Sequence, residues 1–275
     1  MEFFPSVSLQ YLKGDKHEYS FRYYRRITRP RYNNINPFQF CQSNNVISEG
    51  NPDLLPSIRT RFAVGYTYDN TYTLEFIYDN NENQFSELVF QDNEANLLRF
   101  ISSNLESSYS YGLDFTFNKD ITNFWNSYVL ATYFFKKDGF NDLSSGQLIE
   151  NSIGTWIART NQSFTLFADR SLFIDLQFFY RSATVSGNRR TDGISTLGLM
   201  LRKNIWDKKA SLSLGVSDIF NQGNVFSTRQ FLDQNNSTFT RQENRLLTFA
   251  FRYKFGNTGI KTNKKRKRVQ ERNRI

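Results

Sequence analysis

The chain has one histidine and one cysteine, the residues whose chemistry could make it an enzyme or a metal protein. Cys41 by itself cannot form an internal disulfide or a cysteine-based metal cluster. A serine–histidine catalytic site would have to use His17, which stands in the strand-like run Lys16-His17-Glu18-Tyr19. Nothing around His17 points to catalysis, so we interpret it as an incidental polar position and Cys41 as a chance thiol. We predict no enzymatic activity, no cofactor and no metal.

Basic residues are concentrated at the C-terminus. The net charge is +9, and residues 257–275 hold eight lysines and arginines against the single acid Glu271, which accounts for +7 of that total. A run of this kind binds nucleic acid or anionic lipid in some proteins, but a solvated tail is the commoner case. Because the rest of the chain is nearly neutral, we predict a disordered basic tail at 257–275 and no nucleic-acid partner.

Apolar and polar residues alternate with a period of two along the chain, which indicates β-strands. The alternation is clearest between Ser108 and Asn118. In an extended strand, successive side chains point to opposite faces of the sheet. One face of this segment is therefore small or polar, and the other is apolar or aromatic. The apolar set comprises Tyr109, Tyr111, Leu113, Phe115 and Phe117.

The same alternation recurs along most of the chain, for example at 172–180 and 247–255. Strands this long and this aromatic are rarely sustained in a soluble sandwich, whereas transmembrane β-barrels have them. Short connections alternate with longer ones, such as those at 29–56 and 138–146. We predict eleven strands, at 3–12, 17–28, 57–68, 71–91, 97–118, 123–137, 147–168, 171–185, 191–203, 208–230 and 238–255.

The mean hydropathy of −0.59 agrees with a membrane protein of this class. No stretch approaches the roughly 18 consecutive apolar residues that a membrane-spanning helix needs. A closed barrel crosses the bilayer with only every second residue apolar, because its backbone groups are paired between strands. We therefore predict an all-β, antiparallel transmembrane β-barrel over residues 1–256, with outer-membrane lipid against its apolar face.

The two ends of the chain give further expectations. Short turns of such barrels face the periplasm, which places the C-terminal tail in the periplasm and Met1 outside. The first residues, Met-Glu-Phe-Phe-Pro, do not have the features of a signal peptide. Bacterial single-chain barrels have an even number of strands, so eleven strands predict an incomplete barrel.

Three ordered motifs carry a resemblance to a known family. They are Arg-Arg-Ile-Thr-Arg-Pro from Arg25, Asn-Pro-Phe at 36–38 and Gly-Asn-Pro-Asp-Leu-Leu-Pro at 50–56. In this order they resemble motifs of TonB-dependent receptors, in the C-terminal part of their outer-membrane β-barrel domain. That domain is of the outer membrane protein beta-barrel family. The runs at 110–114, 218–221 and 251–256 look similar to later strands of the same domain.

The resemblance implies a non-enzymatic receptor for ligand uptake. In that family a 22-stranded barrel encloses an N-terminal plug, and a periplasmic energy-coupling protein pulls on a segment before the plug. The eleven strands would be half of such a barrel, so the expected partners are the other barrel half, the plug, the coupling protein and an unidentified imported ligand.

The longest predicted connection, 29–56, is the expected outer loop. It contains Pro30, Pro37, Pro52 and Pro56, which cannot donate to a strand ladder, so it is either a rigid loop or a ligand contact. The predicted ligand rim in this loop consists of Asn36, Phe38, Asn51 and Asp53.

Three alternatives remain open from the sequence. The first is a complete small porin or adhesin barrel, which would need an even strand count. The second is a barrel enzyme such as an outer-membrane phospholipase, which would depend on His17. The third is a soluble β-rich or nucleic-acid-binding protein, although an aromatic face of this extent would aggregate in water.

Overall fold

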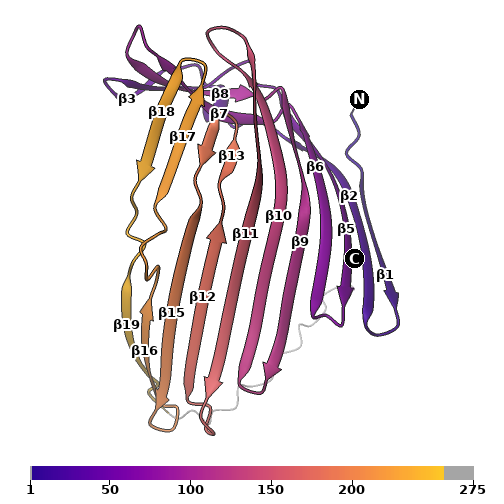
Figure 1. The fold of residues 1–275 in the computed structure, drawn as a ribbon, viewed down its shortest axis with the longest axis vertical. Coiled ribbons are helices and arrows are strands. Elements are labelled where there is room, and N and C mark those ends of the chain that lie inside the picture. Colours follow the sequence, from indigo (N-terminus) through magenta and orange to yellow (C-terminus); the bar gives the residue numbers. More distant parts are fainter. Residues whose placement is uncertain (1, 257–275) are drawn as a thin grey trace, which may run out of the picture.

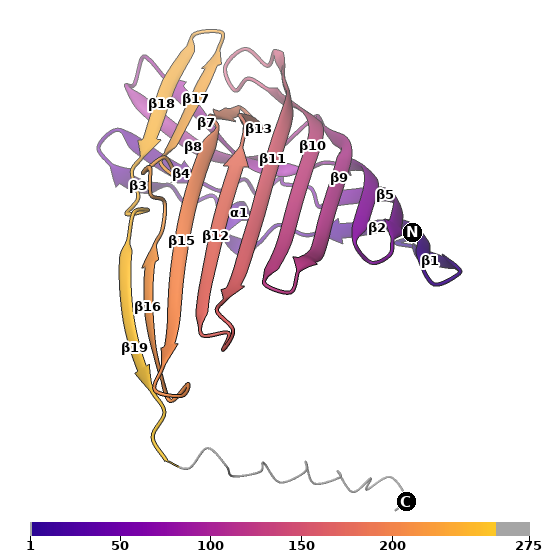
Figure 2. The ribbon, with the colours of Figure 1, turned by 60° about the horizontal axis from the view of Figure 1, so that its bottom comes forward.

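The computed structural model describes residues 2–256 and consists mainly of one antiparallel sheet of eleven strands (Figure 1). Figure 2 shows that this sheet curves into a wall. The prediction of eleven strands is confirmed for this large sheet, and the predicted tail at 257–275 lies outside the described residues. In sheet order the strands are β1 (Ser6–Lys13), β2 (His17–Thr28), β5 (Ser57–Tyr68), β6 (Tyr72–Glu82), β9 (Ser107–Thr122), β10 (Trp125–Asn141), β11 (Leu148–Leu166), β12 (Leu172–Arg181), β15 (Ile194–Ile205), β16 (Ala210–Val216) and β19 (Leu247–Tyr253).

Two smaller sheets stand at one end of the wall, at the top of Figure 1. Both are formed by segments that connect wall strands, and the short helix α1 (Tyr32–Ile35) lies in the first of these connections. One sheet contains β3 (Phe40–Ser43), β4 (Val46–Glu49), β8 (Leu97–Asn104) and β7 (Phe85–Asp92), and the other contains β13 (Thr184–Ser186), β14 (Arg189–Thr191), β17 (Val225–Phe231) and β18 (Gln234–Thr240).

These smaller sheets correct several predicted strands. Each of six predicted ranges joins all or part of a wall strand to all or part of a smaller-sheet strand: 71–91, 97–118, 171–185, 191–203, 208–230 and 238–255. The chain turns out of the wall at residues with left-handed backbones, such as Asn83 with φ 50° and Asp218 with φ 41°. The two-residue period continues on both sides of these turns because both segments are strands, so the period alone did not separate them.

The two ends of the wall differ in their connections, as predicted. At the lower end of Figure 1, the wall strands are joined by the short turns 14–16, 69–71, 123–124, 167–171 and 206–209. Asp69 and Asn70 in the turn 69–71 have φ values of 52° and 50°, the left-handed backbone that tight hairpin turns use. The long connections 29–56, 83–106, 142–147, 182–193 and 217–246 are at the other end.

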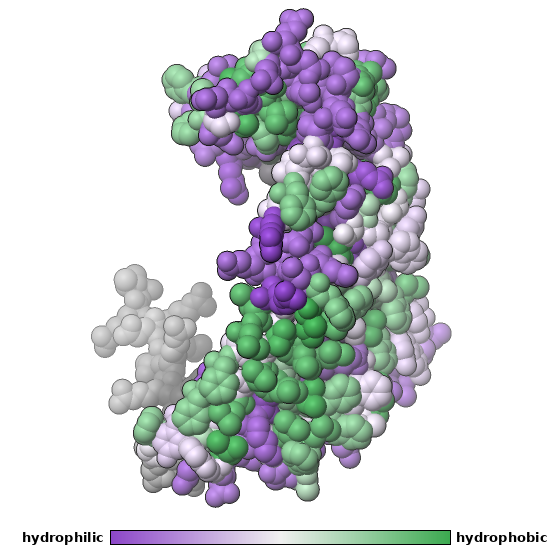
Figure 3. Space-filling model, turned by 60° about the vertical axis from the view of Figure 1, so that its left-hand side comes forward, coloured by the Kyte–Doolittle hydropathy of each residue, from purple (hydrophilic) through white to green (hydrophobic). Residues whose placement is uncertain are grey.

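The outer face of the wall is apolar across neighbouring strands. The register aligns Leu74 with Phe115 and Phe76 with Leu113, so the apolar sets of β6 and β9 fall on the same face. Leu113 is 46% exposed, and the other three are exposed as well. In the view of Figure 3, hydrophobic residues gather over the lower part of the molecule, below a more hydrophilic upper part. An apolar surface of this extent is suited to lipid rather than to water.

The apolar core lies under the smaller sheets rather than in the wall. Its buried residues come from β7, β8, the segment after β8 and the upper end of β10, and Phe231 of β17 packs against them. The Phe231 ring lies edge-on to Phe90 and Phe140, with centroids 6.3 and 5.2 Å away. The core members are Leu88, Phe90, Ile101, Leu105 and Phe140. Within residues 2–256, no helix is long and apolar enough to cross a membrane.

Candidate functional site

The predicted rim residues lie at two adjoining places in the first long connection. Asn36 and Phe38 help to line an open cavity of about 310 Å³ between α1, β3 and β4. The side-chain oxygen of Asn36 accepts a hydrogen bond from the Phe38 backbone N–H at 3.2 Å, and the Phe38 ring is exposed. The structure therefore brings this pair together.

Asn51 and Asp53 form a turn beside this cavity and do not line it. The Asn51 side chain accepts from the Asp53 N–H at 2.9 Å, and the Asn51 N–H donates to the Asn34 carbonyl at 2.7 Å. Gly50 makes this close approach possible, because a Cβ at this position would lie 2.5 Å from the Asn36 carbonyl oxygen. The four residues thus lie close to one another at the end of the wall that carries the long connections.

His17 and Cys41 lie away from one another. His17 is at the short-turn end of β2, where its Nδ1 and the Tyr66 hydroxyl are 2.8 Å apart. Its ring is 5.2 Å from that of Tyr68, so it belongs to a group of aromatic side chains near the short turns. Cys41 is exposed on β3 at the opposite end of the wall. Among the described residues, no group of three or more His, Cys, Asp or Glu side chains is placed to hold a metal ion.

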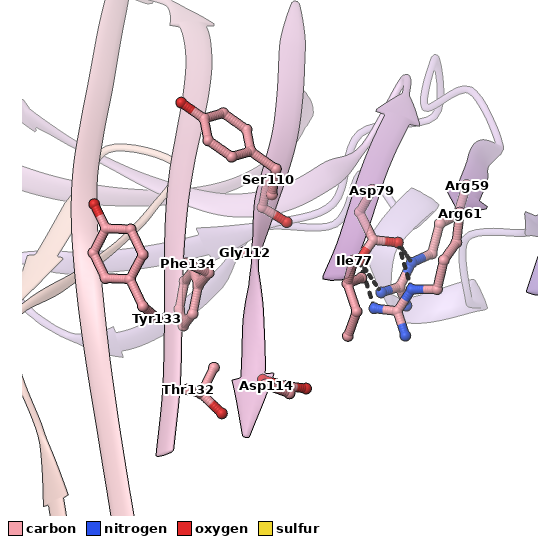
Figure 4. A pocket seen from close by; sticks show the side chains of 11 residues that line it. Arg59, Arg61, Ile77, Asp79, Ser110, Gly112, Asp114, Thr132, Tyr133 and Phe134 are labelled. Carbon is pink, nitrogen blue, oxygen red and sulfur yellow. Dashed lines mark hydrogen bonds and ion pairs between the residues drawn. The ribbon is translucent and has the colours of Figure 1, made fainter. Parts of the chain in front are cut away.

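The inner face of the wall carries a charged cluster that the sequence did not single out (Figure 4). Asp79 of β6 receives two hydrogen bonds from Arg59, at 2.7 and 2.9 Å, and two from Arg61, at 2.8 and 2.5 Å. The Asp79 side chain is only 6% exposed, whereas that of Arg59 is 41% exposed. Two-pronged arginine–carboxylate pairs fix geometry as well as charge, so this cluster is a rigid part of the wall.

More positive charge lies beside this cluster. Arg22 pairs with Glu75, and the Arg26 guanidinium lies 4.4 Å from the centre of the Tyr24 ring. With Arg59 and Arg61 this makes four arginines against three carboxylates, Glu18, Glu75 and Asp79, on the inner face of β2, β5 and β6. The inner face over these three strands is therefore polar and charged, with a small excess of positive charge.

A cavity of about 270 Å³ opens next to Arg59, Arg61 and Asp79. Its far side is formed by β9 and β10, where Phe134 lies across Gly112 (Figure 4). A Cβ at Gly112 would meet the Phe134 Cα at 2.7 Å, so glycine is required for this close contact. The inner wall can thus present charged groups and space to a molecule inside the curve of the sheet.

The β13–β14 hairpin is fastened to the inner wall by a buried carboxylate. Asp138 of β10 is fully buried and accepts hydrogen bonds from the Ser108 hydroxyl and the Gly187 N–H, each at 2.8 Å. It also pairs with Lys136 at 2.7 Å. Gly187 is the turn residue of the hairpin, with φ 56°. A buried charge is stable only with such partners, so the hairpin is held in one position at the long-connection end.

The two smaller sheets are joined by side-chain amides. Asn188 donates to the Val89 carbonyl at 2.7 Å and accepts from the Val89 N–H at 3.4 Å. Gln234 contacts Gln91 of the same strand in the same way, at 2.9 and 2.5 Å. Each amide takes the place of a neighbouring strand at the edge of β7, so the two smaller sheets form one connected structure.

A buried arginine adds positive charge to one of the two smaller sheets. Arg229 of β17 donates to Asn236 at 3.3 Å. Burial lowers the pKa of the Arg229 guanidinium, and the charge of Arg189 nearby lowers it further. The lowered pKa indicates that this guanidinium is held in an environment unfavourable to its charge.

The sequence signal for the inner cluster was only partial. Alternation places Arg61, Glu75 and Asp79 on the polar face of their strands. The register that sets Arg61 opposite Asp79 is a property of strand pairing, and it is not visible in the spacing of these residues. The neighbouring paired position, Arg59 with Asn81, brings the second guanidinium within reach of the same carboxylate.

Comparison with known proteins gives a family match and a set of structural neighbours. The sequence model of the outer membrane protein beta-barrel family matches residues 1–253. No curated protein matches the chain. The siderophore receptor PirA from Pseudomonas aeruginosa has a similar structure, with a TM-score of 0.58 and 14% identity over 82% of this chain and 40% of PirA.

The ferric enterobactin receptor PfeA from the same organism is similar to the same degree. A PfeA mutant in complex with enterobactin has a TM-score of 0.58 and 14% identity, covering 90% of this chain and 39% of PfeA. PfeA in complex with BCV-L6 gives 0.58 and 13%, over 90% and 40%. The chain thus spans about 40% of the length of these receptors, and at this identity the likeness shows a shared fold.

Proposed function

The chain belongs to the outer membrane protein beta-barrel family, and on that premise we propose that it forms the C-terminal part of the wall of a TonB-dependent receptor that imports a ligand. The observation that carries the proposal is the eleven-stranded sheet itself, with its apolar outer face, its charged inner face and its two free edges. In this arrangement the chain contributes lipid-facing wall, inner wall and outer loops, and it performs no covalent chemistry.

The strand directions support a wall that other strands complete. Among the described residues, β1 pairs only with β2, and β19 pairs only with β16. Both edge strands run from the long-loop end to the short-turn end (Figure 1). Neighbours in an antiparallel barrel alternate in direction, so β1 and β19 cannot be antiparallel neighbours of each other. The same holds for β19 of one copy and β1 of a second copy.

An odd number of additional strands would restore the alternation. The large outer-membrane transporter barrels have 22 strands, and eleven added to this sheet would complete one of that size. We infer that the remaining strands are supplied by another segment whose two edge strands run from the short turns to the long loops. A plug inside the barrel, a periplasmic energy-coupling protein and an imported ligand are the further partners.

The outer connections are the proposed ligand entrance, with Asn36, Phe38, Asn51 and Asp53 at its rim. Their support is position, since all four lie at the long-loop end, with the Phe38 side chain exposed. This end faces outside, and the short turns and the C-terminus face the periplasm. The cationic inner wall would then line the path below the entrance.

Uptake measurements on cells with and without the gene would test this function. We expect deletion to reduce uptake of at least one iron–siderophore complex in a panel that includes ferric enterobactin, the ligand class of the structural neighbours. We also expect an uncoupler of the proton gradient to abolish the gene-dependent uptake, because import by such receptors is energy-coupled. Gene-dependent uptake that survives the uncoupler would contradict the proposal and indicate a porin.

A further inference from the structure

A second group of positive charges lies on the inner face at the short-turn end, far along the sheet from the Arg59–Asp79 cluster. It lines a cavity of about 410 Å³ formed by β15, β16, β19 and the turn 206–209. The cations of this basic groove are Arg202, Lys208, Lys209, Arg252 and Lys254, and all five are exposed.

The strand register explains how the groove is formed. Arg202 of β15 lies opposite Ser213 of β16, and Arg252 of β19 lies opposite Ser211. The two arginines therefore stand on either side of β16, whose serines are too short to fill the space between them. On β19, Ala250 lies opposite Ser213 and also has a short side chain, so no large side chain fills the groove there. The result is an open groove with a small-residue floor and cationic sides.

Among residues 2–256, no acid compensates the charge of the groove. No Asp or Glu of this part of the chain lines it, and none of its five cations forms an ion pair with another described residue. The inner-wall cluster differs in this respect, because Glu75 and Asp79 neutralise part of its charge. Five like charges in one groove repel one another, so an anionic occupant would relieve that repulsion.

We propose that this basic groove binds an acidic polypeptide segment that lies inside the barrel at its periplasmic end. The occupant is polypeptide rather than a small anion because the cations are spread across three strands and a turn. Neighbouring strands are about 4.8 Å apart, so a single small anion would reach only some of these cations. A chain with carboxylates at intervals can contact all of them. Lipid is excluded as the occupant because it covers the opposite, apolar face.

This inference rests on the proposed function only in taking the inner face as the barrel interior. Its test measures binding by the full chain in detergent micelles, so it does not depend on whether the protein imports a ligand. The probe is a fluorescein-labelled octapeptide of alternating Glu and Ser, and the comparison peptide alternates Gln and Ser. Anisotropy is measured at low ionic strength, where exposed charges are little screened.

The test variant is Arg202→Gln with Arg252→Gln, and the matched control is Arg241→Gln with Arg245→Gln. The control removes the same two charges from exposed positions at the long-loop end and outside the groove. All variants keep the basic segment 257–275, so any binding to it contributes equally. We expect the acidic peptide to bind about tenfold more weakly to the test variant, as for the loss of about two exposed ion pairs. Binding to the control should not change.

Three results would overturn the proposal. They are equal weakening in the test and control variants, equal binding of the two peptides, and complete displacement of the acidic peptide by inorganic phosphate at similar concentration. The last result would identify a site for a small anion. If the test variant does not fold, Lys208→Gln with Lys209→Gln removes two groove charges from the turn and leaves the strands unchanged. The same tenfold weakening is expected.

Discussion

At the scale of single residues, the inner wall depends on Asp79. Four hydrogen bonds from Arg59 and Arg61 converge on a carboxylate that is almost completely buried. Without this anion, the two guanidiniums would lie side by side with no charge between them. Asp79 therefore allows β5 to carry two arginines two positions apart on one face.

We expect Asp79→Asn to destabilise the folded protein. The substitution keeps the size of the side chain but removes the charge and half of its acceptor capacity, so the loss should be about 1–3 kcal/mol. The measurement is the urea midpoint in detergent micelles. The control is Asp114→Asn on the same face of β9, which should change stability by less than about 0.5 kcal/mol. Equal losses in the two variants would show that Asp79 has no special structural role.

At the scale of elements, each wall strand has one face for lipid and one for the interior. On β9 the faces are represented by Leu113 and Thr116, three residues apart. Leu113 is level with Phe76 of β6, and Thr116 is level with Thr73. The same introduced charge should therefore have opposite consequences at the two positions.

We expect Leu113→Lys to block membrane assembly and Thr116→Lys to be tolerated. A lysine facing lipid near the bilayer midplane costs about 2–4 kcal/mol, whereas a lysine facing the interior remains hydrated. Assembly is measured as the fraction that migrates as a compact band on unheated gels of outer membranes. Equal assembly of the two variants would contradict the assignment of the faces.

The two smaller sheets depend on amide side chains that complete the edge of β7. Asn188→Ala would leave the Val89 N–H and carbonyl without these partners in a buried place, at a cost of about 1–3 kcal/mol. We expect faster hydrogen exchange and faster proteolysis within 83–106, with no change in the wall strands. Asn235→Ala is the control, because it removes only an exposed contact with Gln230. Equal protection in both variants would contradict the role of Asn188.

The elements also show which parts of the fold the sequence could predict. Alternation is local, so it predicted eleven strands and the polar face for residues such as Arg61 and Asp79. It did not show that Phe85–Asp92 leaves the wall, because that segment is a strand in either sheet. Its place depends on contacts with residues such as Gln234, which is 143 positions from Gln91. The inner cluster and the basic groove depend in the same way on register between strands.

At the scale of the whole molecule, the direction of the edge strands determines how the wall can close. A sheet with eleven strands has edges that run the same way, so direct closure would place β1 and β19 in parallel. The outer-membrane family to which the chain belongs closes its sheets with antiparallel neighbours. The free edges of β1 and β19 therefore predict that other strands separate them in the assembled protein.

Engineered cysteine pairs in a Cys41→Ser background would test this closure. Ser213→Cys with Ala250→Cys is the positive control, since these residues are directly opposite on β16 and β19 and face inward. A disulfide requires Cα atoms within about 7 Å, and facing residues of an antiparallel pair are about 4.5–5.5 Å apart. We expect this pair to oxidise readily in outer membranes.

The test pairs combine Ala250→Cys on β19 with Gln10→Cys or Ser8→Cys on β1. We expect neither pair to form a disulfide, either within one chain or between two copies. Cross-linking as efficient as in the control would mean that eleven strands close by themselves or with a second copy, and it would contradict the odd number of additional strands on which the proposed receptor wall depends.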